Sequence, residues 1–324
     1  MKKLAMILIV LILLVPMSFA QDDNEITWTL VSEEAVSPNG SFGEWNSRWN
    51  EPGAAIYYEG QYHLFVNGYP SGIGSNNGIG YRVSDDGINY EWATEDPLLR
   101  RDDFPNEPLS IAANDVIVLD DGTWVLYFHN FNSSNWPRIR GTLGRATAPA
   151  PSGPWTIDED LILVQGEDGS WDDASVAYAS VTQVEDSFVM YYVGGNSTGL
   201  ESVGRATSED GIVWIKDAEP VLVPNTEAGE PGIFIVTEVI FDGEQWIMAY
   251  KSHSAGVGFA FSEDGVTWER YPDNPIILST DVQNLTAIGF ISFIEDDEGN
   301  NILFIEGNNS SSTQVYAVNV VIPD

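Results

Sequence analysis

Residues 236 to 268, VTEVIFDGEQWIMAYKSHSAGVGFAFSEDGVTW, carry the pattern from which the fold is predicted. Two short apolar runs flank Asp242-Gly243, a two-residue turn signal, and this arrangement predicts a β-hairpin. A third run ends at Ser262-Glu263-Asp264-Gly265, where glycine suits a tight turn, and Trp268 opens a fourth run. The stretch therefore predicts one four-stranded antiparallel unit. A carboxylate, Glu238, lies inside its first strand, where apolar residues are expected.

Four further stretches repeat this pattern at intervals of about sixty residues, which is the signature of a repeat architecture. Each has an aromatic-rich second strand, such as FVMYY at 188–192, and three of the third strands run into a Ser-x-Asp-Gly turn that we expect to be structural. The first strands are expected at residues 53–58, 115–119, 174–181, 237–241 and 288–294. Four short strands repeated five times predict an all-β fold, a five-bladed β-propeller with four-stranded antiparallel blades.

The last repeat lacks a fourth strand, because the sequence stops soon after its third strand at 315–321. Residues 26–36, ITWTLVSEEAV, alternate weakly between apolar and polar and have no local partner. We predict that this N-terminal strand completes the last blade and closes the ring, which leaves no open sheet edge. Residues 21–324 are thus expected to form a single propeller domain.

The first twenty residues are predicted to be a signal peptide. Lys2 and Lys3 precede an apolar run at 4–15, and Ser18-Phe19-Ala20 ends in the small-x-small pattern of a cleavage site. Cleavage near Ala20 gives a secreted protein, extracellular or periplasmic. An uncleaved membrane anchor is the alternative, since the run is near the lower limit for spanning a bilayer. We expect no other contact with a membrane.

The composition limits the partners of the chain. It contains 13 Lys and Arg against 49 Asp and Glu, a net charge of −36, and such a surface repels nucleic acid and anionic membranes. Aromatic residues make up 12%, so the acidity does not indicate disorder. The absence of cysteine excludes disulfides and thiolate metal sites. We expect a soluble monomer that binds neither nucleic acid nor membranes.

Carboxylates stand at four of the five predicted first-strand starts. In a propeller the first strands line the central channel, and residues at their starts and after the second strands converge on one mouth. Burial and like-charged neighbours raise the pKa of acids in such a place, which marks it as a candidate site. The four residues are Glu51, Asp115, Asp173 and Glu238.

The arrangement resembles the five-bladed propellers of glycoside hydrolase families 43 and 32, the arabinanase, xylosidase and invertase group, over nearly the whole mature chain. The resemblance is carried by four segments, which are Asn50-Glu51-Pro52-Gly53, Ala113-Asn114-Asp115-Val116, Asp173 before Ala-Ser-Val, and Glu238 ahead of Phe241-Asp242-Gly243. It implies that Glu238 is the general acid, Glu51 the base, Asp173 the residue that tunes the acid, and Asp115 a carboxylate that orients the substrate. We therefore predict a secreted glycoside hydrolase that acts on an oligo- or polysaccharide, with Glu238 protonated, Glu51 ionised and an inverting outcome.

Further residues are predicted to bind the substrate at the same mouth. His129, Arg140, Lys251 and His253 follow or end second strands and suit a sugar hydroxyl, a uronate carboxylate or a phosphate, while Trp49 and Trp171 suit the floor of a sugar site. No cofactor is required. The resemblance implies a Ca²⁺ ion in the central channel, although the sequence has no calcium loop of the EF-hand type.

Three other functions remain open from the sequence. Glu51 is one methylene longer than the aspartate of those families, and the proline after Asp173 is absent, which favours a non-catalytic carbohydrate-binding or surface-interaction propeller. A mannoside phosphorylase-like enzyme would use phosphate, which secretion argues against. A sialidase-like enzyme needs three arginines and a tyrosine nucleophile, and no such arginine set stands on the predicted first strands.

Overall fold

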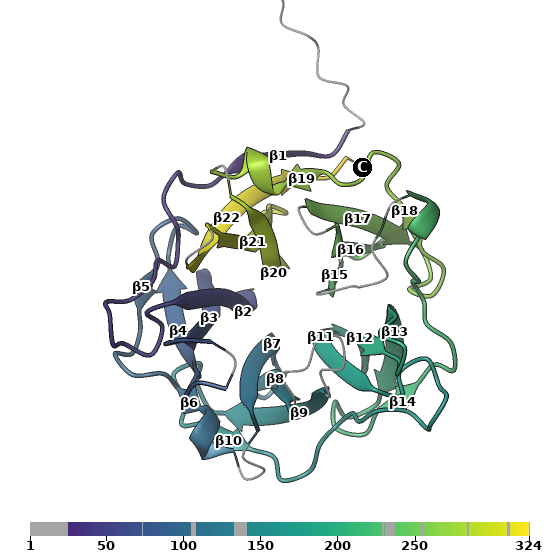
Figure 1. Ribbon diagram of the computed structural model, residues 1–324, viewed down its shortest axis with the longest axis horizontal. Helices are drawn as coiled ribbons and strands as arrows, with labels where there is room; N and C mark the ends of the chain where they lie inside the picture. The colour runs from purple at the N-terminus through teal and green to yellow at the C-terminus, as the bar shows by residue number, and fades with distance from the viewer. Residues whose placement is uncertain are drawn as a thin grey trace, which may run out of the picture.

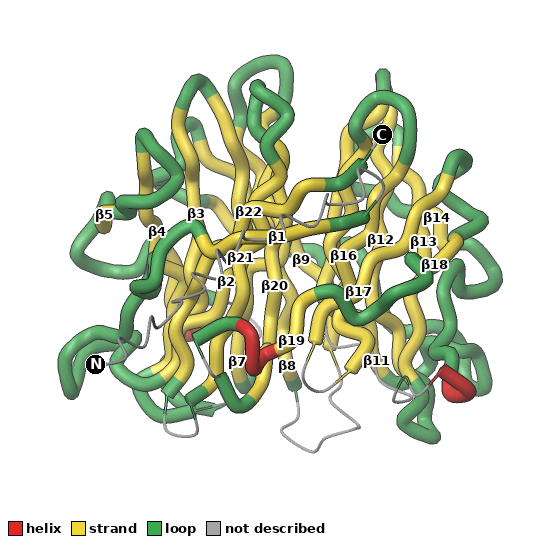
Figure 2. Tube along the Cα trace, turned by 90° about the horizontal axis from the view of Figure 1, so that it is seen from above, coloured by secondary structure: helices red, strands yellow, loops and turns green. Residues whose placement is uncertain are grey.

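The structure is a computed structural model, and it describes residues 25–72, 74–104, 108–132, 141–228, 230, 237–253, 256–283, 285–309 and 312–323. The predicted signal peptide lies outside these residues. The regular structure of the described residues is β-strand, with three single turns of 3-10 helix in the loops (Figure 2). None of the described residues forms a helix long and apolar enough to cross a membrane. The prediction of an all-β chain is therefore confirmed.

The strands form four hydrogen-bonded sheets. The largest has nine strands, in two groups: β2 (Trp49–Tyr58), β3 (Gln61–Tyr69), β4 (Gly78–Ser84), β5 (Glu91–Trp92) and β6 (Leu99–Arg100), followed by β20 (Ala287–Glu295), β21 (Asn301–Asn308), β22 (Thr313–Val321) and β1 (Thr27–Leu30). Between the two groups only Trp49 and Thr313 are paired within the described strands. This single parallel pair joins the two groups of strands.

The other three sheets are each built from consecutive strands. The second sheet contains β7 (Ser110–Val118), β8 (Trp124–Phe131), β9 (Gly141–Ala148) and β10 (Thr156–Ile157). The third contains β11 (Ser175–Val184), β12 (Ser187–Gly195), β13 (Glu201–Ser208) and β14 (Ile215–Lys216). The fourth contains β15 (Thr237–Phe241), β16 (Trp246–His253), β17 (Gly256–Ser262), β18 (Glu269–Arg270) and β19 (Ile277–Leu278). The 3-10 turns are η1 (Arg101–Asp103), η2 (Thr226–Ala228) and η3 (Ser279–Asp281).

The sheets are arranged radially around a common axis, as in a propeller (Figure 1). The strands nearest the axis are the inner strands β2, β7, β11, β15 and β20, each the first of its group in sequence apart from the outer strand β1. Each inner strand packs beside the next one around the axis. Residues at the same level of these five strands therefore face one another. We call the end of the axis where the inner strands begin and the second strands end the mouth.

Two of the inner strands start four or five residues earlier than the sequence pattern predicts. The strand predicted at 53–58 begins at Trp49, and the one predicted at 115–119 begins at Ser110. Small and polar residues, such as those in Ser110–Asp115, are compatible with these strands because the strands are covered on both faces by neighbouring sheets. Glu51 is therefore inside a strand, and Asp115 lies five residues beyond a strand start rather than at it.

The N-terminal segment pairs with the last strand of the chain. Residues 27–30 form β1, antiparallel to β22, with Thr27 opposite Val321 and Leu30 opposite Val318. The predicted strand at 26–36 is thus shorter, and Ser37 adds one isolated bridge to Val315. The pairing has the partner and the outer position that the sequence predicts.

The Ser-x-Asp-Gly turns are structural, as expected. In the turn that follows β17, one carboxylate oxygen of Asp264 accepts hydrogen bonds from Val266 N at 2.8 Å and Thr267 N at 2.6 Å. The Ser262 hydroxyl donates to the same oxygen at 3.0 Å and accepts from Gly265 N at 2.9 Å. These bonds satisfy the amides of the turn, so its acid is not available for chemistry.

Candidate active site

The inner strands change direction close to the mouth through β-bulges. Among the described residues, bulges fall at Gly53, Asn114, Tyr178-Ala179 and Gly289-Phe290, one each in β2, β7, β11 and β20. A bulge re-aims side chains and interrupts strand pairing, and bulges are frequent beside functional sites. Four bulges around one axis therefore place irregular backbone and redirected side chains at the mouth.

Glu51 is a buried carboxyl at this end of β2. Its side chain is 6% exposed, and its Oε2 atom has no hydrogen-bond partner among the described residues. Burial raises the pKa of Glu51 well above its usual value, and the charge of Glu306 raises it further, while a hydrogen bond with Tyr69 opposes the shift. Glu51 thus holds its proton to a higher pH than a free glutamate does. The sequence-based prediction has it ionised, and the difference arises because the carboxyl lies inside the strand, away from solvent.

Glu306 on β21 is the acid that acts on Glu51. Its carboxylate accepts a hydrogen bond from Phe290 N at 2.9 Å and is also bonded by the Thr313 side chain. Burial raises the pKa of Glu306, while these bonds and the nearby Lys251 lower it, so it is the more readily ionised of the pair. The carboxylate occupies the space above Gly289, where a Cβ atom would overlap it.

Tyr178 stands among three acids. It is the bulge residue of β11 and adopts φ of 56°, which is rare for a large side chain. Burial and the charges of Glu201, Glu51 and Glu306 raise the pKa of Tyr178 well above its usual value, so all three carboxyls act on its hydroxyl. None of the described residues forms a hydrogen bond with that hydroxyl.

Glu201, the first residue of β13, completes the group. It is 7% exposed, its Oε2 atom lacks a partner among the described residues, and burial raises its pKa to about 8. Glu51, Glu201, Glu306, Tyr178 and Lys251 are called the mouth cluster below. The cluster combines buried acids, a phenol and an ammonium group, and two of its carboxyl oxygens have no hydrogen-bond partner among the described residues.

His129 lies behind the mouth cluster. Its Nδ1 atom is within 3.0 Å of the Asn114 amide, its ring contacts those of Tyr178 and Phe131, and its Nε2 atom has no partner among the described residues. Burial lowers its pKa to about 3, so the imidazole is neutral at physiological pH. His129 thus lies near the mouth, and its ring packs against the ring of Tyr178.

Glu238 and Asp115 lie deeper along the axis than Glu51. Glu51 is paired with Asn67, which lies two residues before the mouth end of β3. Asp115 is paired with Tyr127 of β8, four residues before the end of that strand. Glu238 is paired with Ala249 of β16, also four residues before the end of that strand. Two residues of a β-strand correspond to about 7 Å. The structure therefore brings Glu238 together with Asp115 and not with Glu51.

A cavity of about 280 Å³ contains Glu238 and Asp115. Both oxygens of Asp115 accept backbone hydrogen bonds, from Val116 N at 2.7 Å and from Val181 N at 2.5 Å. Ser180 Oγ donates to Val239 O and accepts from Val239 N. These bonds link neighbouring sheets. The polar groups of the cavity are thus largely satisfied within the protein, in contrast to the mouth cluster.

The position of Glu238 predicts a pH-dependent effect on stability. Burial first, then the charge of Asp115, raises the pKa of Glu238, and the pKa of Asp115 itself is raised to about 7. Tyr57 and Glu295 are the other titratable residues of the cavity. Because the folded protein holds the Glu238 proton more tightly than the unfolded chain, the wild type loses stability as the pH rises above the unfolded value near 4.5.

Glu238→Gln is therefore expected to be similar to the wild type in stability at pH 4 and to be the more stable of the two at pH 8. Urea unfolding at both pH values measures the difference. The same substitution at the exposed Glu159 is the control and should show no such pH dependence. A Glu238→Gln protein that is less stable than the wild type at pH 8 contradicts the prediction.

Asp173 belongs to the loop that precedes β11. Its carboxylate accepts hydrogen bonds from Gly169 N at 2.9 Å and Ser197 N at 2.7 Å, which fasten two loops together. Asp115, rather than Asp173, is the acid that raises the pKa of Glu238. The structure thus does not bring Asp173 together with Glu238, and its predicted tuning role stays a prediction.

The two predicted aromatic floor residues differ in their surroundings. Trp171 lies over Gly194 and Gly204, where side chains would overlap its ring, and stacks on Tyr192 at 5.6 Å. Trp49 is half-buried, with its ring 5.8 Å from that of Tyr69, the residue bonded to Glu51. Trp49 is therefore the aromatic residue associated with the mouth cluster, and Trp171 has a packing role on its own sheet.

Two predicted substrate-binding residues are not tested by the structure. Arg140 lies outside the described residues, and of His253 only the backbone, at the end of β16, is described. No group of three or more His, Cys, Asp or Glu side chains is placed to hold a metal ion in the described parts of the chain. The predictions about cofactor and calcium remain predictions.

Two acids of the mouth cluster were not predicted from the sequence. Glu306 ends the run ILFIE, and the corresponding positions of FVMYY and WIMAY hold tyrosine. A carboxylate in a place otherwise taken by an aromatic residue is a signal that could have identified it. Glu201 has no comparable signal, because it is one acid among many at the edge of a loop.

The comparisons with known proteins bear on the fold. No protein-family model matches the sequence, and no curated protein is significantly similar to it. A similar structure is that of a family 117 glycoside hydrolase of Zobellia galactanivorans, with a TM-score of 0.64 and 16% identity over 93% of this chain and 92% of that chain. A thermostable family-43 glycoside hydrolase has a TM-score of 0.62 and 16% identity over 84% of this chain and 88% of that chain. The Bombyx mori family 32 β-fructofuranosidase has a TM-score of 0.65 and 14% identity over 91% of this chain and 62% of that chain. The chain has their fold. The resemblance predicted from sequence is confirmed at that level.

Proposed function

We propose that this protein is a glycoside hydrolase whose active site is the mouth cluster. The observation that carries the proposal is a set of buried polar atoms that have no hydrogen-bond partner in the described part of the chain, Glu51 Oε2, Glu201 Oε2 and His129 Nε2, next to the Tyr178 hydroxyl. Leaving such groups unpaired costs about 1–3 kcal/mol each, so a polar ligand is expected to satisfy them. A sugar, with a hydroxyl on most of its carbons, has the matching chemistry. The fold shared with glycoside hydrolases supports the same reaction.

The carboxyl groups divide the roles of an acid and a base. Glycoside hydrolysis needs one protonated carboxyl to donate to the leaving oxygen and one carboxylate to activate water or to attack carbon. Glu51 supplies the protonated group, because its pKa is raised by burial and by Glu306. Glu306 supplies the carboxylate, since Phe290 N, Thr313 and Lys251 favour its ionised form. The roles implied by the family resemblance, Glu238 as acid and Glu51 as base, are tested against this assignment.

The experiment is a glycan panel with the mature chain. Arabinan, xylan, fructan and mannosides are incubated with the wild type, Glu306→Gln and Glu238→Gln, and the released reducing sugar is measured. We expect release by the wild type and by Glu238→Gln, and none by Glu306→Gln. Proton NMR of the first product anomer tests the expected inversion. If the wild type binds a glycan of the panel but hydrolyses none, the proposed hydrolase function is wrong. The alternative, a carbohydrate-binding propeller, is then supported.

Several finer features belong to the same proposal. We count the strand groups as five blades and take β1 as the strand that closes the ring, on the support of its pairing with β22. We also propose that the protein is exported after cleavage near Ala20 and acts as a monomer. N-terminal sequencing of the protein recovered from the culture medium or periplasm tests the cleavage site, and light scattering tests the monomer.

A further inference from the structure

Lys251 occupies a fixed position at the mouth. It follows Tyr250 in β16 at a point where the register with β17 shifts, and its side chain is only 7% exposed. The hydroxyl of Tyr250 is bonded to Glu230 at 3.1 Å, and Asn274 Nδ2 donates to the same hydroxyl at 3.2 Å. The residue that precedes Lys251 is therefore fixed by two hydrogen bonds of its side chain.

The Lys251 ammonium forms no ion-pair contact in the described part of the protein. None of the ion pairs formed there includes Lys251. The negative charge that acts on it, without an ion-pair contact, is that of Glu306. The internal segments outside the described residues contain one acid, Glu107. Buried charges in proteins are normally paired, because removing an ammonium from water without a partner is costly. An anion supplied from outside would complete this site.

The neighbouring acids do not take that role. Glu306 is already bonded by Phe290 N and Thr313, while burial raises the pKa of Glu51 and raises that of Glu201 to about 8, which favours their protonated forms. Protonated carboxyls donate hydrogen bonds and do not neutralise an ammonium. Besides the Glu306 carboxylate, the mouth thus contains proton-donating groups and one cation without an ion-pair contact, inside a chain whose net charge is −36.

We propose that Lys251 binds a negatively charged substituent of the sugar, a carboxylate or a sulfate ester, so that the substrate is an acidic glycan. The inference rests on the proposed function and adds the class of substrate. The acidic surface does not prevent binding, since repulsion between exposed charges is screened beyond about 8 Å at physiological ionic strength. The contact with a buried ammonium is short and much less screened.

The test is isothermal titration of the mature protein with matched pairs of oligosaccharides. One pair is oligogalacturonate and its methyl ester, and the other is a sulfated galacto-oligosaccharide and its desulfated form. We expect the charged member of one pair to bind about tenfold more tightly than its neutral counterpart, as for a hydrogen bond to a charged group. The pair that shows the preference identifies carboxylate or sulfate as the ligand group.

The variants decide whether Lys251 is responsible. Lys251→Met keeps the length of the aliphatic chain and should lose the preference, whereas Lys251→Arg should keep part of it, with thermal unfolding as the check on folding. A preference that survives in Lys251→Met, or a wild type that binds no charged member more tightly, overturns the inference. Turnover of neutral glycans alone would also overturn it while leaving the proposed function intact. Binding of a charged member without any turnover would support the inference and overturn hydrolysis.

Discussion

Glu51→Gln is expected to reduce kcat/KM for natural glycans by about 10²–10⁴-fold, the range for loss of a general acid. The amide has the shape of the carboxyl but cannot donate a proton to the leaving oxygen. Glycosides with a dinitrophenyl leaving group need no such proton, so Glu51→Gln should cleave them at close to the wild-type rate. Glu306→Gln should lose activity on both substrates, because the attack on carbon or the activation of water is missing.

The pH profile provides a second readout for Glu51. An acid must be protonated to act, so wild-type activity should fall as the pH rises through the raised pKa of Glu51. This alkaline limb should be absent from the residual activity of Glu51→Gln. If the limb persists in that variant, another group is the acid, and Glu201, whose pKa is raised to about 8, is then the first to test.

Stability separates loss of chemistry from loss of folding. The folded protein holds the Glu51 proton more tightly than the unfolded chain, so the wild type loses stability as the pH rises above about 4.5. Glu51→Gln removes that dependence and should be at least as stable as the wild type at pH 7. An inactive variant that is also less stable would indicate a structural role. Glu238→Gln, which the resemblance predicts to be inactive, is expected to keep its activity.

The propeller could be predicted because its information is local and repeated. Asp242-Gly243 and the Ser-x-Asp-Gly turns specify hairpins by their own backbone preferences, and the aromatic runs specify buried second strands. Five copies of the same pattern remove the ambiguity that any single short strand has. The pairing of residues 27–30 with β22 followed from counting strands, without any local signal.

The site could be predicted less well, because it depends on strand starts and bulges. Asp115 was placed at a strand start, but the chain is already extended from Ser110, so its carboxyl lies deeper with Glu238. The bulge that turns Tyr178 toward the acids has no signature in the sequence Ser-Val-Ala-Tyr-Ala-Ser. Each bulge also moves later residues to the other face of the strand, so an error of one residue changes which side chains meet.

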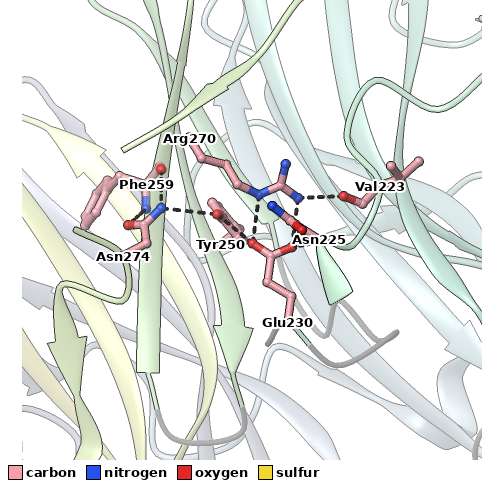
Figure 3. Close-up of polar contacts among 7 residues, drawn as sticks. All are labelled: Val223, Asn225, Glu230, Tyr250, Phe259, Arg270 and Asn274. Atoms are coloured by element: carbon pink, nitrogen blue, oxygen red, sulfur yellow. Dashed lines mark hydrogen bonds and ion pairs between the residues drawn. The ribbon is translucent and has the colours of Figure 1, made fainter. Parts of the chain in front are cut away.

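Arg270→Met is expected to lower the free energy of unfolding by about 3 kcal/mol, the low end of the range for removing one partner of a buried ion pair, because the Arg270 side chain is 24% exposed. Glu230 is 6% exposed and accepts hydrogen bonds from Arg270 Nε at 2.7 Å and Nη2 at 2.8 Å (Figure 3). Tyr250 and the Asn225 amide complete its shell. Without Arg270 the Glu230 charge stays buried, and its donors among the described residues are neutral. Urea unfolding at pH 7 measures the loss.

Two further variants show that the effect comes from burial. The pair of Arg100 and Asp96 has a similar N–O distance of 2.9 Å, but its side chains are 36% and 88% exposed, so Arg100→Met should change stability by less than about 1 kcal/mol. Adding Glu230→Gln to Arg270→Met removes the stranded charge and should recover a substantial part of the loss, because a buried amide needs no counter-ion. Equal losses in Arg100→Met and Arg270→Met would contradict this account. Tyr250 bonds to Glu230 and directly precedes Lys251. Arg270→Met, which leaves Glu230 without its ion-pair partner, should therefore also weaken the binding of glycan at the mouth.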